Sequence, residues 1–404
     1  MIWIILNIVL LIVLALSFQP EEGPTKHYWI GLAVKVSCSL TFGWFYYLHL
    51  ETGDTLMFHQ KALELMKLAE ESFSQYFDYL ITGQYPVYKA ESRTDIFTKV
   101  LSLPYIATQG NYWLSALYLA FFSFLCSWFL FRSVIRYYPI ALIPAFIAFL
   151  LFPSPIFWSS GILKDTLTNG SIFFLAGICI RYRHHYSFTF SQVTVAIACL
   201  FILFYMKFYL AAVAGVCMGF LAWSNLSHAF IQSKTARSLV NLVALVVLIS
   251  LVSLLNRNLN YDRLPAAIYS NYQQIASISS HDVIDFSLDG SYTSVLENTP
   301  KALVTGLFRP FIWESSSLML LFGIENVLIL ALFFANLILI KKWRFNLLIA
   351  LAILFVLSLA IFLPMASPNM GSLVRYKSVF IPFLTFILML TPFEQWFSKK
   401  EQFT

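Results

Sequence analysis

Long blocks of apolar residues, separated by short polar stretches, dominate the chain. Two of these blocks, Leu239–Leu255 and Leu347–Leu363, contain no charged residue. A helix needs roughly 17–25 residues to cross a bilayer. A membrane β-barrel would instead show strands of alternating polarity about ten residues long. Since only helices and closed barrels satisfy their backbone within lipid, the continuous runs predict an all-α integral membrane protein.

The apolar blocks predict about eleven transmembrane helices. Their ranges are 2–18, 28–48, 112–131, 139–157, 166–180, 190–206, 208–224, 238–255, 317–340, 345–363 and 378–391. Lys207 interrupts one long run and separates the sixth block from the seventh. We therefore expect a polytopic protein whose residues 1–404 form a single membrane domain.

Two polar stretches, 49–110 and 256–316, are long enough to hold structure of their own. In the first, segment 55–80 repeats apolar residues at helical spacing among Glu and Lys, which predicts an amphipathic helix on the membrane surface. In the second, segment 300–316 is half apolar and is interrupted by Pro310. It is expected to be a re-entrant or interfacial element, because broken helices are tolerated only inside protein or beside a cavity.

The composition agrees with a membrane protein, and the charges predict its orientation. Hydrophobic residues make up 59% of the chain and charged residues 11%, against about 25% charged in soluble domains. The basic clusters all fall on one side of the predicted layout, which should be the cytoplasm. These clusters are Arg132/Arg136, Arg181/Arg183, Lys234/Arg237, Lys341/Lys342/Arg344 and Lys399/Lys400. The net charge of +6 is therefore an orientation signal and not a sign of nucleic-acid binding.

With this orientation both long loops face outward, which in a bacterium is the periplasmic or exterior side of the inner (plasma) membrane. The direction of the first span stays open, because Glu21 and Glu22 outweigh Lys26 in the segment that follows it.

Ionisable residues at membrane depth are costly and mark functional sites by default. They gather toward the expected outer face. Asp54 follows the second span, where a carboxylate can act as a general base on an acceptor hydroxyl. It is equally suited to cap the amphipathic helix that follows.

The remaining candidates are cations and their acidic neighbours. Arg309 and Arg375 are suited to phosphate, because guanidinium makes forked, charge-assisted hydrogen bonds. Lys164 either binds phosphate or extends to the headgroups. Asp165 either shares that site or caps the fifth span. The predicted substrate-binding residues are His59, Lys164, Asp165, Lys207, Arg309, Trp313, Glu314, Glu325, Arg375, Tyr376 and Lys377.

Two acidic residues, Glu314 and Glu325, have candidate ion-pair partners. Glu314 is expected to pair with Arg309 across a bend. Glu325 lies inside the ninth span, where a carboxylate needs a charged partner or a water-filled cavity. Lys207 or Arg309 would serve as a structural partner. The alternative to a structural ion pair is a catalytic role for Glu325. The five cysteines lie in apolar segments without metal-ligand spacing.

Four stretches carry a resemblance to a known group of enzymes. Residues 53–62, Gly-Asp-Thr-Leu-Met-Phe-His-Gln-Lys-Ala, resemble the first outer loop of bacterial membrane glycosyltransferases of the GT-C superfamily. Residues 152–165, 308–314 and 374–377 are similar to stretches of uncharacterised envelope-polysaccharide membrane proteins. Two features depart from the superfamily: Gly53-Asp54 stands where many members carry an Asp-Glu pair, and the loop follows the second span instead of the first.

The resemblance implies transfer of a sugar from a polyprenyl-phosphate donor at the outer face of the inner membrane. It implies that Asp54 is the base or orients the acceptor, and that Arg309, Arg375 or Lys164 holds the donor phosphate. The expected partners are a polyprenyl-phosphate-linked sugar or glycan and membrane lipids, with no nucleic acid, no cofactor and no obligatory metal.

Three other classes remain open, one of which is a scaffold subunit of an export machine, for which no single polar substitution would abolish function. An O-antigen or exopolysaccharide polymerase or ligase would use a polyprenyl-pyrophosphate-linked glycan and depend on outer arginines. A transporter or lipid flippase would show broken helices at the midplane and often internal repeats, and no repeat is evident in the sequence.

Overall fold

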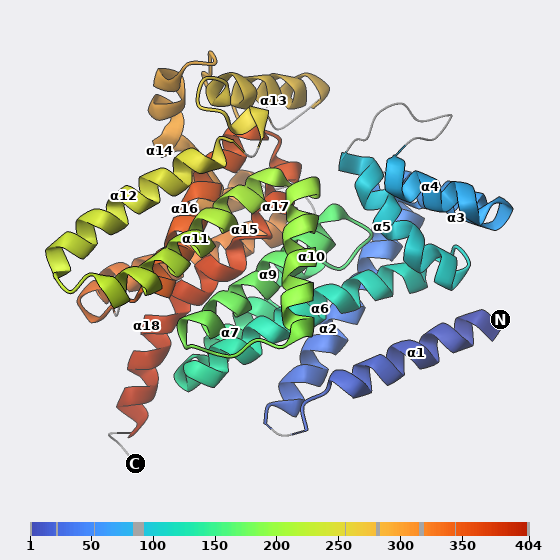
Figure 1. Ribbon diagram of the computed structural model, residues 1–404, viewed down its shortest axis with the longest axis horizontal. Coiled ribbons are helices and arrows are strands. Elements are labelled where there is room, and N and C mark those ends of the chain that lie inside the picture. Colours follow the sequence, from blue (N-terminus) through green and yellow to red (C-terminus); the bar gives the residue numbers. More distant parts are fainter. Residues whose placement is uncertain are drawn as a thin grey trace. The chain divides into compact units, whose positions relative to one another are not determined.

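The computed structural model describes residues 2–21, 23–51, 53–83, 93–254, 256–279, 283–314, 319–343 and 345–401, without the side chains of Arg93 and 395–401. Glu22 and Arg344, and the side chains of Lys399 and Lys400, therefore lie outside the description. The described residues form helices and connections, with one isolated β-bridge between Val283 and Asn369. The prediction of an all-helical chain is confirmed at this level (Figure 1).

The chain divides into two compact units. Unit 1 comprises Met1–Leu130, Ile156–Leu175 and Ser191–Lys207, and unit 2 comprises Phe131–Pro155, Ala176–Phe190 and Phe208–Thr404. Unit 1 contains α1 (Ile2–Phe18), α2 (Thr25–Gly43) with the π-helical turn η1 (Trp44–His49), α3 (Asp54–Glu71), α4 (Phe73–Thr82), α5 (Arg93–Thr108) and nearly all of α10 (Phe190–Met206). Helices α6 (Tyr112–Tyr137), α8 (Pro153–Trp158) and α9 (Lys164–Arg183) contribute to both units.

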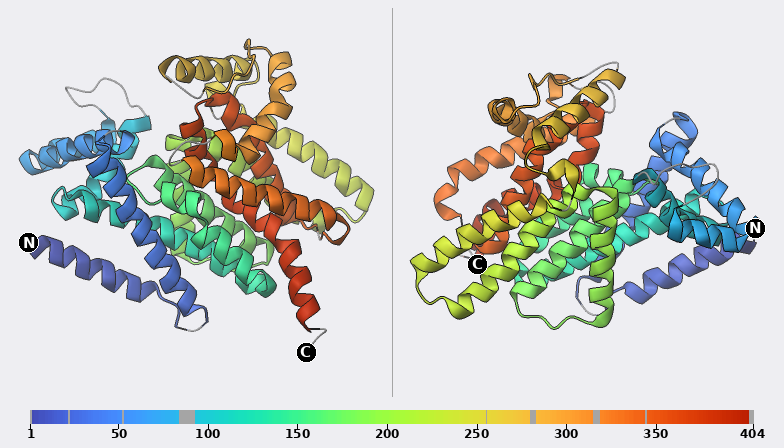
Figure 2. Two further views of the ribbon diagram at one scale, coloured as in Figure 1. Left: turned by 180° about the vertical axis from the view of Figure 1, so that it is seen from behind. Right: turned by 45° about the horizontal axis from the view of Figure 1, so that its top comes forward.

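Unit 2 contains the rest of the chain. Its elements are η2 (Pro139–Ala141), α7 (Leu142–Phe146), η3 (Ile147–Leu151), α11 (Phe208–Phe230), α12 (Lys234–Val252), η4 (Arg257–Leu259), α13 (Leu264–Ile278), α14 (Tyr292–Phe308), η5 (Ile312–Glu314), α15 (Met319–Ile338), η6 (Ile340–Lys342), α16 (Leu347–Ala366), α17 (Met370–Lys377) and α18 (Ile381–Glu401). Helices α11 and α12 lie side by side as a hairpin (Figure 2), and α14 packs against α16.

Among the described residues, five helices are long and apolar enough to cross a membrane: α6, α11, α12, α15 and α16. The pair α17 and α18, bent by 60°, makes a sixth if it is one span. These helices are compatible with a membrane-embedded protein. Helices also occupy the other predicted ranges, but range 139–157 is divided among η2, α7, η3 and α8. Its prolines explain the division, because each lacks an amide hydrogen for the helix.

The first long loop holds a helical layer instead of a single amphipathic helix. Helix α3 buries Thr55, Phe58, Ala62, Leu65 and Leu68, and it packs against α5. These buried positions recur at helical spacing, so α3 is an amphipathic helix. The helix ends at Ser72, whose hydroxyl accepts a hydrogen bond from the Gln75 amide and starts α4.

Helix α4 leaves an apolar stripe uncovered in unit 1. Phe73, Phe77 and Ile81 follow one another at a spacing of four residues and are 66%, 54% and 68% exposed. Residues four apart share a helix face. This face has the character expected of a helix that lies on a membrane surface.

The second long loop is ordered over α16 and α17. Phe286 is fully buried, and the Ile284 amide donates to the carbonyl of Pro368 at 2.9 Å. Helix α14 ends at Phe308, just before Pro310, as expected for a segment that proline interrupts. Gly306 of α14 permits a close crossing, because a Cβ there would lie 2.0 Å from the carbonyl oxygen of Ala360.

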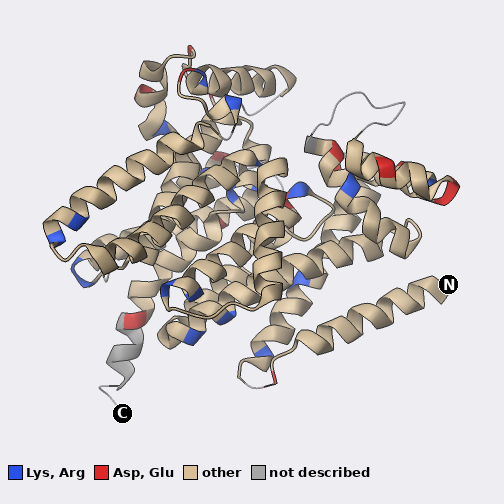
Figure 3. Cartoon of the chain, in the orientation of Figure 1, with Lys and Arg blue, Asp and Glu red and all other residues tan. Residues whose placement is uncertain are grey.

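Basic residues of unit 2 lie at the turns between its helices and also in the second long loop. Figure 3 shows Lys and Arg at the turn between α11 and α12 and after α15, at the end of the unit away from α13. Arg136 and Arg181 both lie over the ring of Tyr186, with their guanidinium carbons 5.3 Å and 5.1 Å from its centroid.

Candidate functional site

The predicted site residues fall into both units. Unit 1 holds Asp54, His59, Lys164, Asp165 and Lys207. Unit 2 holds Arg309, Trp313, Glu314, Glu325, Arg375, Tyr376 and Lys377.

Asp54 is the first residue of α3 and is exposed. Gly53 occupies the N-cap position with φ of 97°, and no side chain caps the helix there. A positive φ is readily adopted by glycine, so Gly53 turns the chain into α3. Asp54 is therefore not the N-cap that the sequence allowed. Its carboxylate lies in the first turn, where the partial positive charge of the helix N-terminus favours an anion.

A cluster of rings and hydroxyls anchors the start of α3. His59 Nδ1 lies 2.7 Å from the hydroxyl of Tyr105, and Thr55 Oγ1 lies 2.9 Å from that of Tyr112. Tyr47 stacks on Tyr112 with ring centroids 4.2 Å apart. Burial lowers the pKa of His59, which favours a neutral imidazole at neutral pH. These contacts fix the helix that carries Asp54.

Lys164 lies beside the same helix. Its ammonium donates to Thr94 Oγ1 at 3.1 Å and lies 5.4 Å from the centre of the Phe58 ring. Phe58 follows Asp54 by four residues and so shares its face of α3. Unit 1 thus places Lys164 beside the helix that begins with Asp54.

Asp165 and Lys207 form a buried ion pair. The Lys207 ammonium contacts the Asp165 carboxylate, and the two side chains are 9% and 2% exposed respectively. Each charge neutralises the other away from water. The structure therefore gives both residues a structural partner, and separates Asp165 from the contacts of its sequence neighbour Lys164.

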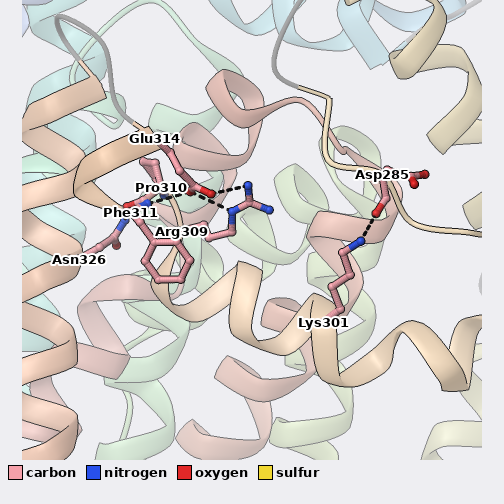
Figure 4. Close-up of polar contacts among 7 residues, drawn as sticks. All are labelled: Asp285, Lys301, Arg309, Pro310, Phe311, Glu314 and Asn326. Carbon is pink, nitrogen blue, oxygen red and sulfur yellow. Dashed lines mark hydrogen bonds and ion pairs between the residues drawn. The ribbon is translucent and has the colours of Figure 1, made fainter.

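In unit 2 the predicted pairing of Arg309 with Glu314 is confirmed. Arg309 Nε lies 3.0 Å from Glu314 Oε2 and Nη2 lies 2.6 Å from Oε1, while the Phe311 amide donates to Oε2 at 3.0 Å (Figure 4). Burial opposes ionisation of Glu314, but the hydrogen bonds from Arg309 and Phe311 outweigh it and lower the pKa. The fork of Arg309 is therefore engaged by a carboxylate. Nearby, Lys301 donates to the carbonyl of Asp285.

The other boundary residues have mixed environments. Trp313 is 78% exposed and stacks on Phe311 with centroids 4.9 Å apart. Arg375 lies over the ring of Tyr376, with its guanidinium carbon 5.1 Å from the centroid, and both residues are half-buried. Arg375 and Trp313 are thus more accessible than Lys377.

Lys377 is only 3% exposed. Its ammonium donates to the carbonyls of Arg309 at 2.7 Å and Leu307 at 3.4 Å and to Asn326 Oδ1 at 3.3 Å. An ammonium has three donors, and these acceptors use all of them. Lys377 therefore binds the carboxyl end of α14, where a cation is favoured, and not an accessible phosphate site.

In the described part of the chain, Glu325 forms an ion pair with neither of the cations that the sequence suggested. Lys207 contacts Asp165 and Arg309 contacts Glu314. Glu325 Oε1 instead accepts a hydrogen bond from the Ser154 amide at 2.8 Å. A backbone partner of this kind leaves no trace in the sequence pattern.

A small cavity lies beside Glu325. Its volume is about 10 Å³, and its lining is Ser154, Phe322, Glu325, Asn326, Ile329, Val374, Lys377 and Ile381.

Sequence reasoning missed Lys35. This residue of α2 is 4% exposed, and its ammonium donates to Ser159 O at 2.6 Å, Ser159 Oγ at 2.6 Å and Ser123 Oγ at 3.1 Å. No carboxylate pairs with it among the described residues. The signal was present, because an ionisable residue inside the predicted span 28–48 is itself a functional candidate.

No three His, Cys, Asp or Glu side chains gather to hold a metal ion in the described part of the chain. No known protein family, no curated protein and no solved structure matches the chain.

Proposed function

We propose that the chain is a membrane glycosyltransferase that uses a polyprenyl-phosphate-linked sugar at the outer face of the bacterial inner membrane. The supporting observation is that α3 of unit 1 begins with Asp54 and carries Phe58, against which Lys164 lies. An exposed carboxylate at the start of α3 and an ammonium over Phe58 are the groups that sugar transfer from a phosphate needs. The proposal includes the predicted layout of about eleven transmembrane helices, in which the basic clusters face the cytoplasm.

The chemistry assigns one role to each residue. The acceptor hydroxyl oxygen attacks the anomeric carbon of the sugar, and the bond from that carbon to the phosphate oxygen breaks. Asp54 takes the hydroxyl proton as general base. The polyprenyl phosphate leaves with the bonding electron pair, and Lys164 offsets the negative charge that develops on it.

Contacts within unit 1 hold the start of α3 in place, which supports the role given to Asp54. The His59–Tyr105 and Thr55–Tyr112 contacts hold the first turns of α3 against α5 and α6. A base that acts within hydrogen-bond reach depends on such positioning. His59 thus acts on Asp54 only through α3.

Glycan analysis in cells tests the proposal. We would delete the gene, restore either the native chain or Asp54→Asn, and record mass spectra of polyprenyl-linked and surface glycans. Asp78→Asn is the matched control, because Asp78 is also exposed and lies in the same loop. We expect the deletion and Asp54→Asn to lack one specific sugar, and Asp78→Asn to be normal.

Other outcomes separate the alternatives. Accumulated complete repeat units would support a polymerase or ligase. An unchanged glycan profile in the deletion would exclude all of these enzymes and favour transport or scaffolding. A sugar lost in the deletion but retained in Asp54→Asn would keep the transferase and remove Asp54 as its base.

A further inference from the structure

Two segments of unit 2 carry positive charge without acid. Residues 131–155 and 176–190 contain four arginines and two histidines but no aspartate or glutamate. The arginines lie toward the carboxyl ends of two helices, Arg132 and Arg136 on α6 and Arg181 and Arg183 on α9. Positive charge therefore collects at these helix ends, and neither segment supplies a carboxylate to balance it.

Aromatic contacts hold the two helix ends together. His184, which follows α9, stacks on Tyr137 of α6 with ring centroids 4.1 Å apart and planes 4° from parallel. Its Nε2 lies 3.1 Å from the hydroxyl oxygen of Tyr138. The cations at the ends of α6 and α9 are therefore carried on one scaffold of packed rings.

Two of the arginines share one aromatic ring. The guanidinium carbons of Arg136 and Arg181 lie 5.3 Å and 5.1 Å from the centroid of Tyr186, within the roughly 6 Å over which a cation and a ring attract each other. Arg181 is only 9% exposed, and its Nε donates to Ser133 Oγ at 2.8 Å. Burial is the main cause that lowers the pKa of Arg181, and the charges of Arg136 and Arg132 lower it further. A bound anion would offset the repulsion between these charges.

Arg136 and Arg183 have hydrogen-bond donors to offer a ligand. Across the residues that the structure describes, neither guanidinium makes a hydrogen bond or an ion pair, and that of Arg136 lies near the rings of Tyr137 and Tyr186. Arg136 is exposed and Arg183 is half-buried. A guanidinium has five N–H donors in a planar fork that fits two oxygens of a phosphate. Two such forks are therefore open to an anion at these helix ends.

The surroundings favour a lipid as the source of that anion. Helix α6 is long and apolar enough to cross a membrane, and Arg136 lies in its last turn. Long basic side chains at the end of a span reach the lipid headgroups. Apolar side chains close in sequence to the arginines are exposed, because Ile140 is 56% and Tyr182 37% exposed. Basic pockets beside membrane helices bind anionic headgroups.

We propose that the carboxyl ends of α6 and α9 bind the phosphate of an anionic phospholipid. Arg136 and Arg183 donate to the phosphate oxygens, and Arg181 adds positive charge from its buried position. Ile140 and Tyr182 offer apolar contact to the acyl chains. This lipid site is independent of the proposed sugar transfer, because all of its residues belong to unit 2.

A simpler explanation of the arginines makes a different prediction. A helix C-terminus favours nearby cations by itself, and basic residues gather on the cytoplasmic side of membrane proteins. Either effect would place arginines here without a dedicated headgroup site. A preference for an anionic lipid that depends on Arg136 and Arg183, and not on other basic residues of the unit, is therefore the property to measure.

Native mass spectrometry of the full chain tests the site. The chain would be delipidated in detergent and then mixed with dioleoyl phosphatidylglycerol or with dioleoyl phosphatidylcholine, which carry the same acyl chains. We expect phosphatidylglycerol to be retained roughly tenfold more strongly, because each arginine near an anionic headgroup adds its own attraction. Equal retention of the two lipids would overturn the proposal.

Paired substitutions locate the binding. Arg136→Gln with Arg183→Gln should remove most of the preference, and each single variant should remove part of it. These variants should fold, because neither guanidinium has a hydrogen-bond partner among the described residues. Lys234→Gln with Arg237→Gln is the matched control, since it removes two charges at the start of α12 in the same unit, and it should retain the preference. An unchanged preference in the first pair, or an equal loss in both pairs, would overturn the site.

Thermal unfolding distinguishes a lipid from free phosphate. A ligand that binds only the folded chain raises the unfolding midpoint. We expect phosphatidylglycerol to raise the midpoint of the native chain by several degrees more than that of Arg136→Gln with Arg183→Gln. Inorganic phosphate at matched ionic strength should leave both midpoints unchanged. An equal rise with inorganic phosphate alone would assign the site to free phosphate and overturn the lipid.

Discussion

The buried pair of Asp165 and Lys207 permits a quantitative prediction. Its side chains are 2% and 9% exposed, so removing one partner leaves the other charge buried and unpaired. Such changes cost about 3–5 kcal/mol. We expect Lys207→Met and Asp165→Asn each to lower the free energy of unfolding, with Lys207→Met the more costly because it leaves an ionised carboxylate. The double variant should recover most of the loss, because neutral partners of similar volume are often tolerated.

The coupling between the two residues is measured from the free energies of unfolding, in detergent micelles or nanodiscs, of the native chain, the two single variants and the double variant. From these costs we expect a coupling of about 3 kcal/mol. The pair of Lys61 and Asp95 is the matched control, because its atoms are 3.6 Å apart and its side chains 29% and 11% exposed. A partly exposed pair contributes about 0–1 kcal/mol. Single-variant losses below about 1 kcal/mol that simply add in the double variant would refute the reasoning for the buried pair.

Other expectations follow from particular positions. Gly306→Ala places a Cβ 2.0 Å from a carbonyl oxygen of α16 and should cost about 1–3 kcal/mol; Gly215→Ala, with nothing within 4 Å of its Cβ, should be neutral or slightly stabilising. Burial lowers the pKa of His59, so the unfolded chain binds the proton more readily than the folded one. The stabilising contribution of His59 to folding is therefore fully present above about pH 6.5 and declines as the pH falls. The free energy of unfolding of His59→Phe, measured across this range, should lack that decline. Lys164→Gln should reduce sugar incorporation at least tenfold while Lys67→Gln, an exposed site on α3, leaves it unchanged; equal incorporation in the two would remove Lys164 from the phosphate site.

The parts of the fold that follow from local pattern were predictable. Apolar runs without charges identify helices such as α12 and α16, and the spacing of apolar residues in α3 identifies its buried face. The break at Ser72 was not predicted, because one hydroxyl hydrogen bond decides it. The division of range 139–157 was also missed, although its prolines carry the signal.

The site was predictable only where partners are close in sequence. Arg309 and Glu314 lie five residues apart, and their pairing was expected. The pairing of Lys207 with Asp165 joins residues 42 positions apart, and Glu325 accepts from a backbone amide 171 positions away. Long-range contacts of this kind depend on how helices pack, which residue spacing does not encode. Lys377 likewise reads as a boundary cation in the sequence but binds carbonyls at the end of α14 in the structure.

The central claim is that Asp54 is the base of a sugar transfer. The most direct measurement is the mass spectrum of polyprenyl-linked and surface glycans from cells that carry Asp54→Asn in place of the native chain, with Asp78→Asn beside it. The account predicts that one specific sugar is absent with Asp54→Asn and present with Asp78→Asn. A complete glycan with Asp54→Asn, at normal protein levels in the membrane, would contradict it.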